Sequence, residues 1–72
     1  MDPRVEDLAH RIRERRRSLK LTQDEVADLA GCSPRFVRAL EAGKPGVRLD
    51  KLLDVAEVLG LRLDLVQRTE QG

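Results

Sequence analysis

Arg35 and Arg38 are the side chains of this sequence whose type and spacing point most directly to chemistry. A guanidinium can donate two parallel hydrogen bonds, either to O6 and N7 of guanine or to phosphate oxygens. At about 100° per residue, both arginines fall on one side of a helix whose opposite side carries Phe36, Val37 and Leu40. The segment therefore predicts a helix with a buried apolar face and a free basic face.

The neighbouring residues divide by the contact that each side chain suits. Arg35 is the first candidate for reading a base directly, and Arg38 is the second, with a phosphate contact as an equally weighted alternative. Each bidentate contact of arginine to guanine is worth roughly 1 to 3 kcal/mol of discrimination against the wrong base. Gln23, Ser33 and Lys44 suit positioning contacts to phosphate, and Pro34 and Ala39 suit packing on a thymine methyl group.

The start and end signals of two short helices frame this face. Thr22 is a favourable N-cap, and Glu25 three positions later completes a capping box, so a helix is predicted to begin here. Gly31 can adopt the left-handed conformation that ends this helix. Ser33 and Pro34 then form the N-cap and first-position pair that opens the next one. A turn of only three residues therefore separates the two helices.

The first of these helices has an apolar side that matches the buried face of the second. Val26, Ala27 and Ala30 form this side, and the small side chain of Ala27 allows the helices to cross at close range. Two helices joined in this way form a helix-turn-helix arrangement, whose second helix enters the DNA major groove with its N-terminal residues at the base edges.

Two further helices are predicted around this unit. Asp2 opens a segment with apolar residues at helical spacing that continues to about Leu19. After a loop rich in turn-forming residues, another segment of this kind begins at Leu49 and is ended by Gly60. Residues 1–60 are therefore predicted to form one DNA-binding domain.

The residues that follow, 61–67, alternate in a way that is typical of a strand. The apolar positions are Leu61, Leu63, Leu65 and Val66, of which the first three alternate with polar residues. Because the chain has no second strand candidate, this strand either pairs with the same strand of another copy across a two-fold axis or is a frayed tail. We expect the paired strand, and hence a homodimer, with a flexible tail at residues 68–72.

Length and cysteine content limit how such a domain is stabilised. A chain of 72 residues forms one small domain, and such domains often need a metal, a disulfide or a partner subunit. One cysteine and one histidine allow neither an intramolecular disulfide nor a cluster with metal-ligand spacing. Dimerisation is the common solution that remains.

Several classes of protein are not expected. Without a nucleophile–base pair or a phosphate-cradling glycine loop, the chain offers no enzyme site, and neither a cofactor nor a small-molecule ligand is expected. No apolar run reaches the length of a membrane span, and residues 1–20 are too charged for a secretory signal. We therefore expect a cytoplasmic protein without membrane contact.

Charge is distributed unevenly along the chain. Residues 1–20 carry seven basic and four acidic side chains, whereas residues 21–72 carry seven basic and nine acidic ones, for a net charge of +1. The basic run at residues 11–17 could suggest nucleic acid. A run of charges on an amphipathic helix is usually a solvated face, however, and this interpretation is favoured for any single arginine of the run.

Arg15 and Arg16 are exceptions, because each lies about 50° from the centre of the apolar stripe, on opposite flanks. One of them is expected to need a partner. Glu41, on the flank of the second motif helix, is the best candidate. Breaking a half-buried arginine–carboxylate pair from one side costs on the order of 3 kcal/mol or more. Helical periodicity does not choose between the two arginines.

These features together resemble the Cro/C1-type (Xre-type) helix-turn-helix proteins, and within them the HipB-like antitoxins. The general resemblance rests on Leu21, Thr22, Gln23, Ala27, Gly31, Val37, Leu40, Glu41 and Gly43. The narrower one rests on the alternating tail and on Arg35, Phe36, Val37, Glu41, Gly43, Lys44, Pro45, Val47, Arg48, Leu49, Asp50 and Lys51. The sequence departs from its relatives at Lys20, where they often carry a glycine, and at Pro34 and Arg35, where they often carry amides.

The resemblance implies a mainly α, four- to five-helix, lambda-repressor-like domain with a C-terminal β-strand that pairs across a homodimer. It favours Arg16 over Arg15 as the partner of Glu41, and it assigns Gln23 to the DNA backbone or an adjacent base. The dimer interface that it implies consists of Leu61, Leu63, Leu65 and Val66.

The function expected from the residues is that of a dimeric, sequence-specific repressor of a double-stranded DNA operator. Its half-sites would lie one helical turn, about 34 Å, apart. The narrower resemblance implies in addition an antitoxin that represses its own operon and neutralises a HipA-type toxin kinase. The alternative is a stand-alone phage- or plasmid-type repressor with no toxin partner.

Overall fold

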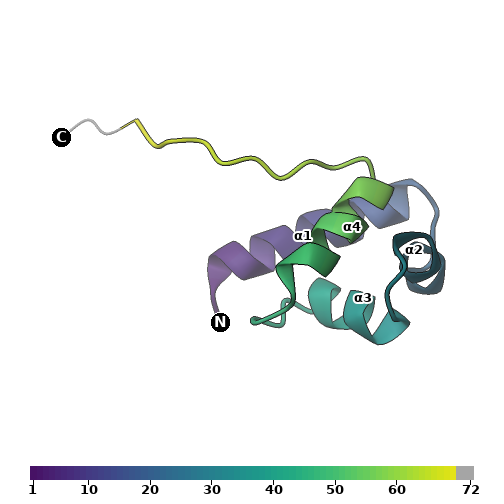
Figure 1. The fold of residues 1–72 in the computed structure, drawn as a ribbon. Coiled ribbons are helices and arrows are strands. Elements are labelled where there is room, and N and C mark those ends of the chain that lie inside the picture. Colours follow the sequence, from purple (N-terminus) through teal and green to yellow (C-terminus); the bar gives the residue numbers. More distant parts are fainter. Residues whose placement is uncertain (70–72) are drawn as a thin grey trace.

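The computed structural model describes residues 1–69 and shows a mainly helical chain (Figure 1). In this range lie four helices, α1 (Pro3–Ser18), α2 (Gln23–Ala30), α3 (Pro34–Glu41) and α4 (Leu49–Val58). The predicted mainly helical fold is confirmed, and these residues form four helices where four to five were predicted. None of these helices is both long and apolar enough to span a bilayer. The tail predicted at residues 68–72 falls largely outside the described range.

Local hydrogen bonds set the ends of the two central helices. The Thr22 hydroxyl accepts from the Glu25 N–H at 3.0 Å, and the Glu25 carboxylate accepts from the Thr22 N–H at 2.8 Å, which completes the capping box of α2. Gly31 ends α2 at a φ of 71°. The Ser33 hydroxyl then accepts from the Phe36 N–H at 3.1 Å and caps α3. Interactions between residues close in the sequence therefore set the start and end of α2 and the start of α3.

Lys20, which follows the end of α1, has a left-handed backbone with a φ of 60°. Its N–H donates to the carbonyl of Arg17 at 2.9 Å, and the N–H of Leu21 donates to the carbonyl of Arg16 at 3.2 Å. These bonds close the C-terminal end of α1. A residue with a Cβ is strained in this conformation by roughly 1 kcal/mol or more.

Replacing Lys20 with glycine is therefore expected to raise the free energy of unfolding by about 0.5 to 1 kcal/mol, since glycine reaches this φ without a Cβ clash. Urea unfolding followed by circular dichroism measures the change. Lys20→Ala is the matched control, because it removes the same charge and keeps the Cβ, and it is expected to leave stability nearly unchanged. Equal stabilisation by both variants would indicate a charge effect in place of backbone strain.

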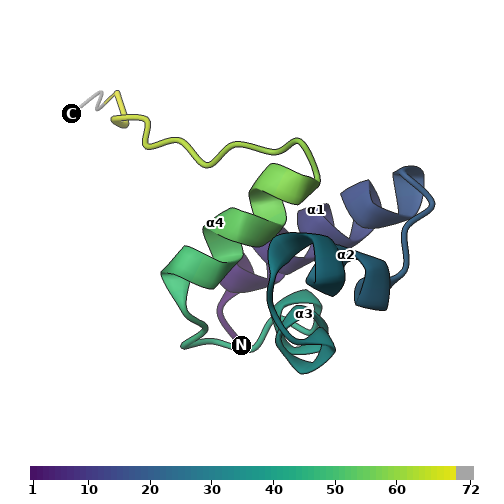
Figure 2. The ribbon, with the colours of Figure 1, turned by 45° about the vertical axis from the view of Figure 1, so that its right-hand side comes forward.

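The core is built from the apolar faces of all four helices. Its most deeply buried side chains are Ile12, Val26, Val37, Val55 and Leu59. α2 packs against α3 and α4, and α1 packs against α3. Figure 2 shows the helices gathered around this centre. One face of α3 is thereby buried, and its other face is left at the surface.

Residues 61–69 leave the helical body as an extended segment (Figures 1 and 2). Leu61 packs against the core, whereas Leu65 is 99% exposed and Val66 is 83% exposed. No strand is formed in the part of this single chain that the structure describes. A strand needs a neighbour that completes its backbone hydrogen bonds, and the segment has no such neighbour here. The strand at residues 61–67 therefore stays a prediction about the assembled protein.

Candidate nucleic-acid interface

The surface face of α3 carries the two arginines that the sequence singles out. Arg35 and Arg38 are exposed, whereas Val37 is fully buried and Leu40 is 4% exposed. Pro34, the first residue of the helix, is half-buried. The predicted division of α3 into an apolar face and a basic face is therefore present in the fold.

A shallow hollow, which we call the loop-side hollow, lies where one edge of this face meets the loop between α3 and α4. Its lining residues are Ser33, Arg35, Phe36, Ala39, Lys44, Pro45, Gly46, Val47 and Arg48. Four of the predicted DNA contacts meet here, namely Ser33, Arg35, Ala39 and Lys44. The hollow combines three basic side chains with a small apolar patch.

A second hollow, which we call the α1-side hollow, lies at the other edge of the surface face of α3, where this helix meets α1 and α2. Its lining residues are Arg13, Arg16, Arg17, Gln23, Arg38, Glu41 and Ala42. It brings together Gln23 and Arg38, the remaining polar residues of the predicted DNA site. Arg35 of the first hollow and Arg38 of the second lie about 60° apart around the axis of α3, because three residues turn the helix by about 300°. Basic side chains therefore border the surface face of α3 on both sides.

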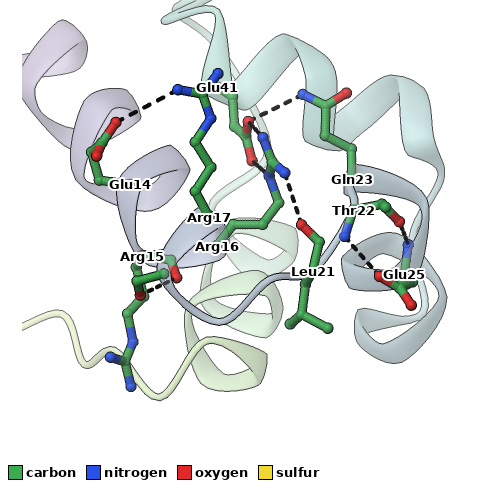
Figure 3. Close-up of polar contacts among 10 residues, drawn as sticks. Glu14, Arg15, Arg16, Arg17, Leu21, Thr22, Gln23, Glu25 and Glu41 are labelled. Atoms are coloured by element: carbon green, nitrogen blue, oxygen red, sulfur yellow. Dashed lines mark hydrogen bonds and ion pairs between the residues drawn. The ribbon is translucent and has the colours of Figure 1, made fainter.

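A buried ion pair ties α3 to α1 beside the α1-side hollow (Figure 3). Arg16 Nε donates to Oε2 of Glu41 at 2.7 Å, and Arg16 Nη2 donates to Oε1 at 2.9 Å. The two side chains are 12% and 3% exposed. Arg16 Nη1 also donates to the carbonyl of Leu21 at 2.8 Å. The hydrogen bonds to Glu41 raise the pKa of the Arg16 guanidinium, although burial opposes this effect.

Arg15, the other candidate partner of Glu41, contacts a different helix. Its Nε donates to the carbonyl of Leu59 at the end of α4, at a distance of 2.8 Å. A cation is favourable at a helix C-terminus, where carbonyl groups lack partners within the helix. The two arginines therefore flank the apolar stripe as expected, but only Arg16 finds a carboxylate.

Gln23 also contacts Glu41, through its Nε2, which donates to Oε1 at 3.1 Å (Figure 3). Because an ionised carboxylate only accepts hydrogen bonds, this contact decides which end of the amide faces Glu41. The second Nε2 hydrogen and the amide carbonyl oxygen stay available to an outside partner. The side chain predicted to contact DNA is thus oriented by the carboxylate that holds Arg16.

The hollows also contain three basic residues that are not among the predicted DNA contacts, namely Arg13, Arg17 and Arg48. Arg13 and Arg17 are one helical turn apart, so the sequence predicts that they lie on the same side of α1. Only the fold shows that this side of α1 is next to α3. Arg48 Nη2 donates to Oδ2 of Asp50 at 2.7 Å, and both side chains are exposed. This hydrogen bond from Arg48 lowers the pKa of the Asp50 carboxyl.

Comparison with known proteins gives two matches. The family described as HTH_3, helix-turn-helix, matches residues 12–66. A relative from Sinorhizobium fredii, described as the uncharacterized HTH-type transcriptional regulator y4mF, is 38% identical over 65 residues, which cover 90% of this chain and 86% of the relative. Both matches span the two hollows and the whole of α2, α3 and α4.

Proposed function

Because this chain belongs to the helix-turn-helix family of transcriptional regulators, we propose that it is a sequence-specific repressor. In this proposal it binds double-stranded operator DNA as a homodimer. In this proposal α3 enters the major groove and Arg35 reads a base. Lys44 and Ser33 contact phosphate, and Gln23 contacts the DNA backbone or an adjacent base. Pro34 and Ala39 pack on thymine methyl groups.

The observation that carries the proposal is the pair of basic edges along the surface face of α3. The major groove of B-DNA is about 12 Å wide and has a phosphate backbone on either side. A helix in that groove directs its free face at the base edges, and positive groups beside the helix then lie near both backbones. A helix that docked on a neutral protein surface would have no need of basic groups on both sides.

Binding to the DNA upstream of the gene for this protein tests the proposal. Fluorescence anisotropy is expected to give an affinity at least about a thousandfold higher for that DNA than for a random duplex of equal length. Affinity for both duplexes should fall steeply as salt rises, because bound phosphates release counterions. Equal affinities, or affinity that is insensitive to salt, would contradict a sequence-specific repressor.

The homodimer is supported by the segment of residues 61–67. Leu65 and Val66 are almost fully exposed, which is unfavourable for large apolar side chains in an isolated chain. Pairing with the same segment of a second copy would supply the missing backbone partners and bury these side chains. The proposed interface consists of Leu61, Leu63, Leu65 and Val66.

Deleting residues 61–72 is expected to convert the dimer to a monomer, as measured by sedimentation velocity. The matched control deletes only residues 68–72 and should leave the dimer intact, since the proposed strand is kept. Loss of the second copy should also lower operator affinity, because each half-site would be bound alone. A dimer that survives removal of residues 61–72 would place the interface elsewhere, for example on α4.

The finer proposal is that the protein is an antitoxin of the HipB-like kind, which represses its own operon and neutralises a HipA-type toxin kinase. Its support is the resemblance carried by the segment from Arg35 to Lys51 and by the tail. Co-purification with the product of the neighbouring gene tests it. Intact operator binding without any recovered partner would favour a stand-alone phage- or plasmid-type repressor.

A further inference from the structure

We propose that Arg13, Arg17 and Arg38 form a binding site for one backbone phosphate of DNA, and that Arg38 is therefore a backbone contact and not a base reader. This inference rests on the proposed function and deepens that function, because it assigns the α1-side hollow to a backbone phosphate of the DNA. It also extends the proposed DNA interface to Arg13 and Arg17 of α1, which belong to the basic run that the sequence pattern assigns to a solvated face.

Three arginine side chains from two helices line this hollow. Arg13 and Arg17 come from one side of α1, one turn apart, and Arg38 comes from the last turn of α3. Like charges in one hollow repel each other unless an anion lies between them. A phosphate oxygen fits such a cluster, because arginine binds phosphate through paired, charge-assisted hydrogen bonds.

The carboxylate that lines the hollow does not neutralise the three arginines. Glu41 also lines the hollow, but its side chain is 3% exposed and already accepts two hydrogen bonds from Arg16 and one from Gln23. Arg16 balances its charge. Figure 3 shows the long side chain of Arg17 passing beside this pair toward Glu14. The charge of the surrounding arginines is therefore left for another anion.

The remaining partners of the three arginines are weak. Arg17 Nη1 lies 3.9 Å from Oε2 of Glu14, and both side chains are more than half exposed, so the pair contributes little. Among the described residues, no carboxylate lies within ion-pair distance of Arg13 or Arg38. The Nε of Arg13 is buried without a hydrogen-bond acceptor in the protein. A buried donor without an acceptor is unfavourable, which favours an outside group in the hollow.

The position of Arg38 along α3 agrees with this assignment. Base edges are contacted by the N-terminal residues of a recognition helix, and Arg35 lies in the first turn of α3. Arg38 lies one turn farther along α3 and lines the α1-side hollow, whereas Arg35 lines the loop-side hollow. The two arginines of α3 therefore take different roles, with Arg35 at a base and Arg38 at the backbone.

Single Arg13→Gln, Arg17→Gln and Arg38→Gln variants test the site on operator and random duplexes. Each is expected to weaken binding to both duplexes by a similar factor, about eightfold per protein copy at 0.1 M salt, and to lower the salt slope by about one. Arg11→Gln is the matched control, because it removes the same charge from α1 at a residue outside the α1-side hollow, beside Leu8 and Leu61. It should change neither quantity by a comparable amount.

Three results would overturn the proposal. The first is losses in the Arg13 and Arg17 variants no larger than in Arg11→Gln. The second is an Arg38 variant that loses operator binding far more than random binding, which would make Arg38 a base reader. The third comes from a titration with inorganic phosphate, which tests the site even if the wild-type protein binds no duplex and the proposed function is refuted. Phosphate should shift the Nε–H NMR signals of Arg13 and Arg17 more than that of Arg11. Equal shifts of the three signals would refute the site.

Discussion

Replacing Arg35 with alanine is expected to weaken operator binding about 5- to 150-fold more than binding to random DNA. This range corresponds to the roughly 1 to 3 kcal/mol by which a bidentate arginine discriminates guanine from another base. Arg35 is exposed in the first turn of α3, so we expect its replacement to leave the fold unchanged, and the excess loss on the operator measures base readout. Anisotropy titrations of the two duplexes in parallel measure the ratio.

Lys44→Ala is the comparison that makes this result interpretable. Lys44 lines the same loop-side hollow and carries the same charge, but it lies beyond the end of α3. Its loss should weaken both duplexes alike, since a phosphate contact carries no sequence information. If Arg35→Ala behaves as Lys44→Ala does, Arg35 is also a backbone contact, and sequence would have to be read by the apolar contacts of Pro34 and Ala39 or by DNA shape.

The helix-turn-helix unit was predictable because its determinants are local. The capping box of Thr22 and Glu25, the left-handed Gly31 and the cap at Ser33 each act over a few residues, and the structure contains all three. The buried and exposed faces of α3 likewise follow from helical periodicity. Such signals can be read from one sequence, because no distant part of the chain has to be known.

The partners of the α1 arginines were not predictable from these rules. Arg15 and Arg16 lie symmetrically about the apolar stripe, so only the packing of α4 and α3 on either side decides that one meets the Leu59 carbonyl and the other meets Glu41. The same packing turns Arg13 and Arg17 toward α3. Periodicity reports which side of a helix is exposed, and it does not report which surface is next to it.

The segment of residues 61–67 shows a different limit. Its alternation predicts a strand, and a strand is defined by hydrogen bonds to another strand. In the single chain its backbone has no such partner, and the segment is extended. In the proposed homodimer the partner strand belongs to a second copy of the chain, and a pattern read from one chain does not contain that contact.

Replacing Glu41 with alanine is expected to lower the free energy of unfolding by about 3 to 5 kcal/mol, the largest stability change among the variants considered. The substitution leaves the Arg16 guanidinium, only 12% exposed, without its carboxylate. It also removes the acceptor that holds Gln23. In a domain of this size, each kcal/mol corresponds to about 4 to 8 °C, so the melting temperature measured by circular dichroism should fall by at least about 12 °C.

Two further variants show whether the uncompensated charge is the cause. Arg16→Met combined with Glu41→Leu should recover most of the lost stability, because neither charge then remains in the interior. Glu14→Ala removes an exposed carboxylate that lies 3.9 Å from Arg17, and its effect should stay within about 0.5 kcal/mol. A double variant as unstable as Glu41→Ala would assign the loss to packing. A stable double variant with weakened operator binding would show that the Arg16–Glu41 pair also serves binding, since leucine cannot accept the hydrogen bond that orients Gln23 and methionine removes a cation from the α1-side hollow.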